Sequence, residues 1–313
     1  MKEDINISTD LFPKHIGLFI CSNGFEDRWK RVLVNLQDFD INEIVLIDRF
    51  GELACDLVSY DGVDKGKLHV IDVLCENQVE QWNGIYDHIV SKIQSLETSK
   101  VVIDITCIPQ LALYSIVCQL KMLELSEKVT FVYSGASEYN IESFSSSDGS
   151  YNRISTVLGY PGRSNPSCNE QHLVLMVGFD FELAKTLIRD LEPTSLSLGI
   201  GTSPYKEDFE NINTRYLNKI RDYASTQISE DKISTFDFSC SNYPDARNSI
   251  LREFELHKNK NMVLCAMNTK VSSVAAAIAA LEREEIKICH IEPMFRSISD
   301  YSKCSDIVSV FSF

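Results

Sequence analysis

The sequence predicts an α/β protein of two tandem domains, each a mainly parallel sheet flanked by helices, related by internal duplication. Short apolar runs that suit buried strands alternate with segments of helical spacing along the 313 residues. This length is about twice the common domain size. We place the domains at residues 1–160 and 161–313, with a linker rich in Ser, Gly, Pro and Asn at 143–169.

The first half contains five strand-like runs, at residues His15–Cys21, Glu43–Asp48, Leu68–Val73, Val101–Ile105 and Val129–Tyr133. Helical spacing of apolar residues predicts helices over Phe25–Leu36, Glu76–Leu96 and Ile108–Leu125. Pro109 is compatible with the last of these because proline is tolerated in a first turn.

The second half repeats this plan. Its predicted strands are His172–Val177, Ser195–Ile200, Lys232–Phe238, Met262–Met267 and Ile286–Glu292, and its last helix is the alanine-rich segment after Lys270. Two landmarks recur in the same order. Gly24-Phe25-Glu26 corresponds to Gly178-Phe179-Asp180, and a strand–Thr–helix turn occurs at Thr106 and again at Thr269. Duplication explains this order better than chance similarity of βα units, which is the alternative.

Composition limits the classes of partner. Hydrophobic residues make up 44% and charged residues 24%, as in an ordinary globular protein. No apolar run approaches the ~20 residues that span a bilayer, and the acidic N-terminus does not resemble a secretory signal, so we expect a cytoplasmic protein. A net charge of −15 argues against long nucleic acid as the main partner. A small phosphorylated ligand needs only a few local cations.

The ten cysteines include no CxxC pair, and the six histidines are scattered without ligand spacing. Several cysteines lie inside apolar strand or helix patterns, where a free thiol packs as a small hydrophobe. We therefore expect reduced cysteines, no metal site and no cofactor.

Polar residues follow the first and fourth predicted strands of each half. In an open parallel sheet, ligands bind beyond the carboxyl ends of the strands, at the point where the strand order reverses. Helix N-termini there also present free N–H groups. This position predicts ten ligand-binding residues and no catalytic one: Asn23, Glu26, Arg28, Asp104, Thr106, Gln110, Asn268, Thr269, Lys270 and Ser272.

Each of these residues also has a structural explanation. Asp104 and Thr106 could cap the helix that follows them. Arg28 could pair in solvent with Glu26 or Asp27, and Lys270 could be a solvated lysine in a first helical turn.

The segment NTKVSSVAAAIAAL, from Asn268 to Leu281, resembles the Asn-x-Thr-Gly-Gly-Thr-Lys turn and small-residue helix of CARF-type domains. DITCIPQLALYSIVCQL resembles the same element in the first half, and both segments lack the paired glycines. The resemblance implies tandem Rossmann-like domains, as in SAVED-type relatives, that sense cyclic oligonucleotides in antiphage defence. It implies that Asn268, Thr269 and Lys270 contact the ligand. The implication is weaker for Asp104 and Thr106.

Two functions of different classes remain open from the sequence. The first is a sensor that binds a nucleotide-derived signal and acts on a protein effector, with a homodimer left open. The second is a nucleotide hydrolase, phosphodiester or N-glycosidic, with Glu26, Asp104 and Asp180 as acid–base groups. The chain has no Walker motif, GxSxG or HExxH, which favours the sensor. A protein-binding scaffold is a further alternative.

Overall fold

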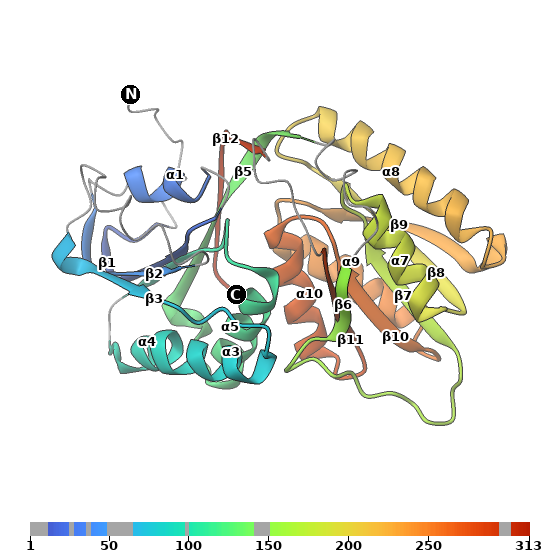
Figure 1. Cartoon of the computed structure of the whole chain (residues 1–313), viewed down its shortest axis with the longest axis horizontal. Helices are drawn as coiled ribbons and strands as arrows, with labels where there is room; N and C mark the ends of the chain where they lie inside the picture. The colour runs from blue at the N-terminus through green and yellow to red at the C-terminus, as the bar shows by residue number, and fades with distance from the viewer. Residues whose placement is uncertain are drawn as a thin grey trace. The chain divides into compact units, whose positions relative to one another are not determined.

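The structure is a computed structural model that describes residues 12–24, 28–35, 39–48, 65–97, 100–140, 151–293 and 302–313. The chain forms two compact units. The first consists of Met1–Tyr139 and Ile298–Phe313, and the second of Asn140–Ser297. Figure 1 colours the chain from its N-terminus to its C-terminus. Among the described residues, no helix is long and apolar enough to cross a bilayer.

The first unit contains a six-stranded sheet within the described residues. Its strands are β1 (His15–Ser22), β2 (Asp40–Ile47), β3 (Leu68–Ile71), β4 (Val101–Asp104), β5 (Val129–Tyr139) and β12 (Ser302–Phe311). They lie in the order β12-β5-β4-β1-β2-β3, with β12 antiparallel to β5 and the other pairs parallel. The five parallel strands thus have the Rossmann order 3-2-1-4-5.

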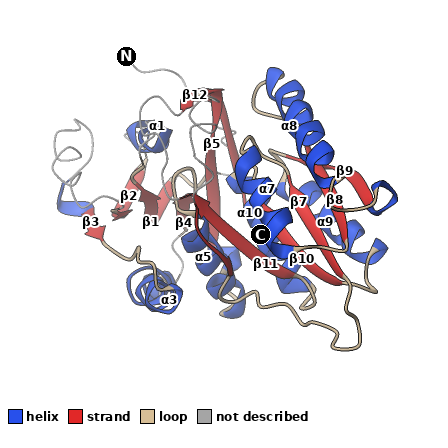
Figure 2. Ribbon diagram, turned by 45° about the vertical axis from the view of Figure 1, so that its right-hand side comes forward, coloured by secondary structure: helices blue, strands red, loops and turns tan. Residues whose placement is uncertain are grey.

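Helices cover both faces of this sheet. They are α1 (Arg28–Asn35), α3 (Gln78–Ile85), the π-helical η3 (Tyr86–Val90), α4 (Ser91–Ser95) and α5 (Gln110–Met122), with short 3-10 turns η2 (Lys65–Lys67) and η4 (Ser126–Lys128). In Figures 1 and 2, α1 lies on one side of the sheet and α3 and α5 lie on the other. Strand β1 is buried along almost its whole length, which explains its continuous apolar sequence.

The second unit has the same arrangement. Its strands are β6 (Tyr151–Thr156), β7 (Gln171–Met176), β8 (Ser195–Thr202), β9 (Ile233–Ser239), β10 (Asn261–Ala266) and β11 (Lys287–Pro293). Their order is β6-β11-β10-β7-β8-β9, with β6 antiparallel to β11 and the others parallel. The helical segments are α7 (Phe181–Leu191), α8 (Asp208–Ala224), the 3-10 turn η5 (Glu230–Lys232), α9 (Tyr243–Leu256) and α10 (Lys270–Glu282).

Successive side chains of a strand point to opposite faces of the sheet, and those on each face of the second sheet contact a different pair of helices. One face forms a buried apolar cluster with α7 and α8, and its members include Leu173, Leu196, Leu187 and Leu217. Residues of opposite parity point to the other face. Helices α9 and α10 pack there against each other and against β9 and β10.

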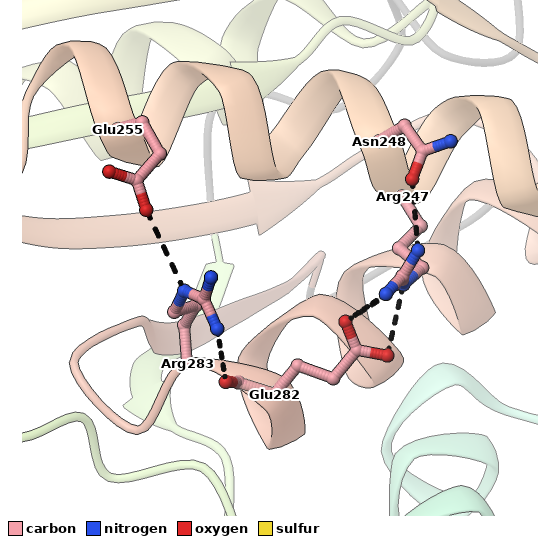
Figure 3. Close-up of polar contacts among 5 residues, drawn as sticks. All are labelled: Arg247, Asn248, Glu255, Glu282 and Arg283. Atoms are coloured by element: carbon pink, nitrogen blue, oxygen red, sulfur yellow. Dashed lines mark hydrogen bonds and ion pairs between the residues drawn. The ribbon is translucent and has the colours of Figure 1, made fainter.

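Side chains tie α9 to α10 at the surface. Arg247 of α9 binds both carboxylate oxygens of Glu282, at 3.0 and 2.9 Å from Nε (Figure 3). Arg283 approaches Glu255 of α9 at 3.8 Å and donates to the Glu282 carbonyl oxygen at 3.1 Å. These partly exposed pairs link two helices that are already packed against each other.

The predicted fold class, α/β with two mainly parallel sheets flanked by helices, is confirmed by these two sheets. All ten strands expected from the sequence are present, with ends displaced by a few residues. The identical order of the five parallel strands in the two sheets is what internal duplication predicts.

The division into units differs from the predicted boundaries of 1–160 and 161–313. Residues 151–156, expected within a linker, form β6 and pair with β11 of the second unit. The C-terminal strand β12, which the sequence analysis did not identify, pairs with β5 of the first unit. Strands β5 and β11 would otherwise end their sheets with unpaired backbone groups. The antiparallel strand of each sheet thus comes from the segment after the last parallel strand of the other sheet: β6 follows β5 and pairs with β11, and β12 follows β11 and pairs with β5.

Candidate functional site

The strand order reverses at corresponding places in the two units. In the first unit this switch point lies between β1 and β4, and in the second between β7 and β10. The landmark turns of the sequence follow these four strands. Ligands of doubly wound sheets bind beyond the strand ends at such a point. The two switch points are therefore the candidate ligand sites.

A group of buried polar side chains, here called the β1–β4 cluster, lies at the switch point of the first unit. Its members come from the carboxyl ends of β1, β2 and β4, from β5 and from the start of α1. Each is at most 8% exposed: Ser22, Asn23, Arg28, Asp48, Asp104, Thr106 and Ser134. Buried polar groups are costly unless they are paired, so their partners indicate what the cluster does.

Asp104 holds the turn after β4. Its Oδ1 accepts hydrogen bonds from the backbone N–H of Thr106, at 3.0 Å, and from the Thr106 hydroxyl. The Thr106 Oγ1 in turn accepts from the backbone N–H of Ser134 at 2.9 Å. Neither residue caps α5, because Pro109 is the N-cap and no side-chain cap bond forms there. The capping explanation is thus wrong for both residues.

Within the described part of the chain, two atoms of this cluster are buried without a hydrogen-bond partner, namely Oδ2 of Asp104 and Oγ of Ser134. Burial also raises the pKa of Asp104 to about 7, although the Thr106 hydrogen bonds and the Arg28 charge oppose the rise. The carboxyl group is therefore close to half-protonated at neutral pH, so it can both donate and accept.

Arg28 is buried beside this carboxyl group, with 4% of its surface exposed. Its Nε donates to the Ser302 hydroxyl at 2.9 Å and its Nη1 donates to the Ser134 carbonyl at 2.9 Å. The guanidinium lies 5.8 Å from the centre of the Tyr133 ring and 5.7 Å from that of Tyr139. The structure thus contradicts a solvated Arg28.

The other predicted residues of the first unit have more ordinary positions. Asn23 donates from Nδ2 to Asp48 at 2.6 Å and so links the ends of β1 and β2. Gln110 is half-buried at the start of α5 and donates to the Tyr114 hydroxyl at 3.1 Å. Glu26 lies outside the described residues.

At the second switch point, Asn268 bonds within its own unit. Its Nδ2 donates to the Val177 carbonyl at 2.7 Å, and its Oδ1 accepts from the Thr269 N–H at 2.9 Å. The Cys240 thiol also lies 3.2 Å from that oxygen. Asn268 therefore joins the turns after β7, β9 and β10.

Thr269 is the N-cap of α10, and its hydroxyl accepts from the Ser272 N–H at 3.2 Å and donates to the Cys240 carbonyl at 2.8 Å. The Ser272 hydroxyl donates back to the Thr269 carbonyl at 2.7 Å. Lys270 is the first residue of α10 and is half-buried. Asp180 caps α7 through the Leu183 N–H at 3.1 Å.

The landmark glycine of the second unit has a steric explanation. A Cβ added at Gly178 would lie 1.9 Å from the Met267 carbonyl oxygen, so only glycine allows the turns after β7 and β10 to approach this closely. The approach explains the landmark without a ligand.

The structure also brings together residues that the sequence analysis did not propose as ligand contacts. Asp48 follows β2, Tyr133 and Ser134 lie inside β5, and Ser302 begins β12. Asp48 carries the same signal as the predicted residues, since it is polar and directly follows a strand. The other three could not be found this way, because their contacts depend on long-range strand pairing.

No family model matches this chain, and no curated protein matches it. Among solved structures, it is similar to a UDP-GlcNAc 2-epimerase from Methanocaldococcus jannaschii, with 9% identity over 84% of this chain and 81% of the other, and a TM-score of 0.28. An N-terminal ketoreductase from a macrolactin assembly line shows 11% identity over 91% of this chain and 71% of the other, with a TM-score of 0.23.

Proposed function

We propose that the chain is a binding module for a small nucleotide-type ligand, and that the ligand binds at the β1–β4 cluster. The observation that carries this proposal is the pair of buried atoms without partners, Asp104 Oδ2 and Ser134 Oγ, beside the buried guanidinium of Arg28. Native proteins rarely leave such atoms unpaired, so a missing partner at a sheet switch point suggests a ligand.

The chemistry of the cluster suits a ligand that carries both hydroxyl and phosphate groups. A carboxyl group with a pKa of about 7 can hydrogen-bond a ribose hydroxyl, as acidic residues do in other Rossmann-like sites. Arg28 and the N-terminus of α5, where no side chain accepts from the first backbone N–H groups, favour an anion. A nucleotide provides both groups.

Sensing is the role that agrees best with this site. In the proposal, ligand binding to the first unit is passed to a protein effector, in the antiviral setting that the CARF resemblance implies. A cyclic oligonucleotide is the ligand that the resemblance favours, and mononucleotides and dinucleotides are the alternatives that a binding test must include.

The test is native mass spectrometry and calorimetry of the full chain with mono-, di- and cyclic nucleotides. The Asp104→Asn variant keeps the size of the side chain and an oxygen for Thr106 but removes the carboxyl group. Its control is Asp180→Asn, the same chemical change at a helix cap that tolerates asparagine.

We expect one ligand mass on the wild type and on Asp180→Asn, and a dissociation constant about 10- to 100-fold higher for Asp104→Asn, because hydrogen bonds to charged groups contribute about 1.5–3 kcal/mol. Equal affinity of all three proteins, or no binding of any nucleotide, contradicts the proposal. The same spectra report whether the chain is a homodimer.

A hydrolase is the second candidate, and the pKa of Asp104 favours it. General acids and bases work best with a pKa near the operating pH, and about 7 meets that condition. If the protein is an enzyme, the bound nucleotide is converted during incubation, and Asp104→Asn stops conversion. Recovery of unchanged nucleotide from the wild type contradicts this candidate and leaves the binding function standing.

A further inference from the structure

A second group of interacting polar side chains lies at the opposite, amino-terminal edge of the second sheet. His172 is the second residue of β7 and is fully buried. Glu253 in the last turns of α9 is 6% exposed, and His257 is the C-cap residue of that helix. The two imidazole rings stack with centroids 3.7 Å apart.

These three side chains have the ligand types and the proximity of a metal site. One ligand atom from each lies within 4.8 Å of the others, and Nε2 of His257 lies 3.9 Å from a Glu253 oxygen. In a tetrahedral zinc site, with bonds of about 2.0–2.1 Å, two ligand atoms are separated by roughly 3.4 Å. The rings stack with 21° between their planes, so one imidazole has to turn out of the stack before nitrogens of both face one ion.

Hydroxyl groups contact both ring nitrogens of His172. Its Nδ1 lies 2.8 Å from the Ser195 hydroxyl, and its Nε2 lies 3.0 Å from the Ser197 hydroxyl. Glu253 also hydrogen-bonds to Ser197, so Nε2 of His172 is the nitrogen on the carboxylate side. Metal-bound histidines donate their other N–H to a second group, and Ser195 is placed to accept from Nδ1, while the ion would displace the Ser197 hydroxyl from Nε2.

We propose that His172, Glu253 and His257 bind a divalent transition metal ion, with zinc the best fit. Nε2 of His172, a nitrogen of His257 and the Glu253 carboxylate form the ligand set. Two imidazoles and one carboxylate are a known zinc set, and imidazole nitrogen disfavours magnesium and calcium, which prefer oxygen.

One nearby cation has to be considered. The Lys260 ammonium donates to the Ser195 hydroxyl at 2.9 Å, on the Nδ1 side of His172. Glu170 pairs with this ammonium at 3.5 Å and offsets its charge. The lysine lies on the Nδ1 side of His172, and its charge acts on both imidazoles.

The ion would join the last turn of α9 to the edge of the sheet. Glu253 and His257 are four residues apart on one helical face, and His172 is on β7, which is far away in sequence. This separation explains why no ligand-spaced histidine pair is visible in the sequence. The site is in the second unit and does not depend on the β1–β4 cluster.

The experiment is cobalt and zinc titration of the chelator-treated full chain, together with the metal content of protein purified without chelator. Removing one ligand in His257→Ala, or neutralising another in Glu253→Gln, avoids the fully buried His172. The controls are Glu255→Gln, on the exposed side of the same helix, and His88→Ala, an exposed histidine of the first unit.

We expect about one metal ion per wild-type chain, tetrahedral cobalt absorption bands, and at least tenfold weaker binding in both ligand variants but in neither control. Thermal melting in the presence and absence of zinc shows whether each variant folds and whether the ion stabilises it. Metal-free wild-type protein that binds no added zinc overturns the proposal. Equal binding by ligand variants and controls also overturns it, because the ion then binds elsewhere.

Discussion

The two units differ in how the polar side chains at their switch points are hydrogen-bonded. Both have the strand order of a Rossmann sheet, and both place polar residues after the strands that flank the switch point. In the second unit, the side chains of Asn268 and Thr269 are bonded to backbone groups of neighbouring turns. In the first unit, Asp104 and Ser134 keep buried atoms without partners.

This difference shows why position in the fold is weak evidence for a ligand contact. The resemblance to CARF-type turns points most strongly to Asn268, Thr269 and Lys270, yet the first two have structural roles that explain them fully. The hydrogen bonds point instead to Asp104, whose second oxygen accepts none from the described residues. We therefore expect substitutions at the two switch points to change stability in opposite directions.

The largest effect is expected for Asp104→Asn. The pKa of Asp104 rises from an ordinary value of 3.8 to about 7 on folding, so the unfolded chain releases this proton at lower pH than the folded chain. Folding stability is thus lost as pH rises from about 4 to about 7, and the loss is then constant. Three pKa units correspond to about 4 kcal/mol. Asparagine has no such loss.

Urea unfolding between pH 4 and pH 8 tests this prediction. The variant should be more stable than the wild type at pH 8, by up to about 4 kcal/mol, and the difference should shrink toward zero at pH 4. Asp180→Asn is the control and should show no such trend. A variant that is less stable at pH 8 would mean that the carboxylate is needed for folding, and the two switch points would then be alike.

A decrease in stability, opposite to the change expected for Asp104→Asn, is expected for Asn268→Ala in the second unit. Alanine leaves the Thr269 N–H without its acceptor and removes one of two donors to the Val177 carbonyl, which retains Asn213 at 2.8 Å. We expect a loss of about 2 kcal/mol in the free energy of unfolding. Chemical denaturation at pH 7 measures it.

Asn218→Ala is the matched control, because Asn218 is exposed on α8. Its stability should stay within about 0.5 kcal/mol of the wild type. If Asn268→Ala is equally harmless but abolishes nucleotide binding, the ligand site lies in the second unit, and the comparison is reversed.

Sequence patterns predicted the parallel sheets well because buried parallel strands are continuous apolar runs, as in the HIGLFICS segment of β1. The two antiparallel strands were not predicted. Strand β6 (YNRIST) is short and polar, and it lies in a segment with the composition of a linker. Strand β12 pairs with a strand more than 160 residues earlier in the chain, a relation that no local pattern contains.

The candidate site was predictable in position but not in detail. Arg28 and Asp104 were found because they lie next to the landmark turns. The sequence could not show that Arg28 is buried, since its burial depends on Ser134 in β5 and Ser302 in β12. Nor could it show which of two similar turns has unpaired atoms, because pairing depends on side chains from three or more strands.

The smallest effect is expected for Thr269→Ala, which separates capping from ligand binding. The Thr269 hydroxyl caps α10, and losing such a cap costs about 1 kcal/mol. Thr269→Ser retains the hydroxyl and should restore most of that stability. Thermal melts measure both variants, and nucleotide titrations of the same samples should give the wild-type affinity. Wild-type stability combined with lost affinity in Thr269→Ala would instead make this hydroxyl a ligand contact, as the CARF resemblance implies. The hydroxyl would then contribute to ligand binding and not to the stability of α10.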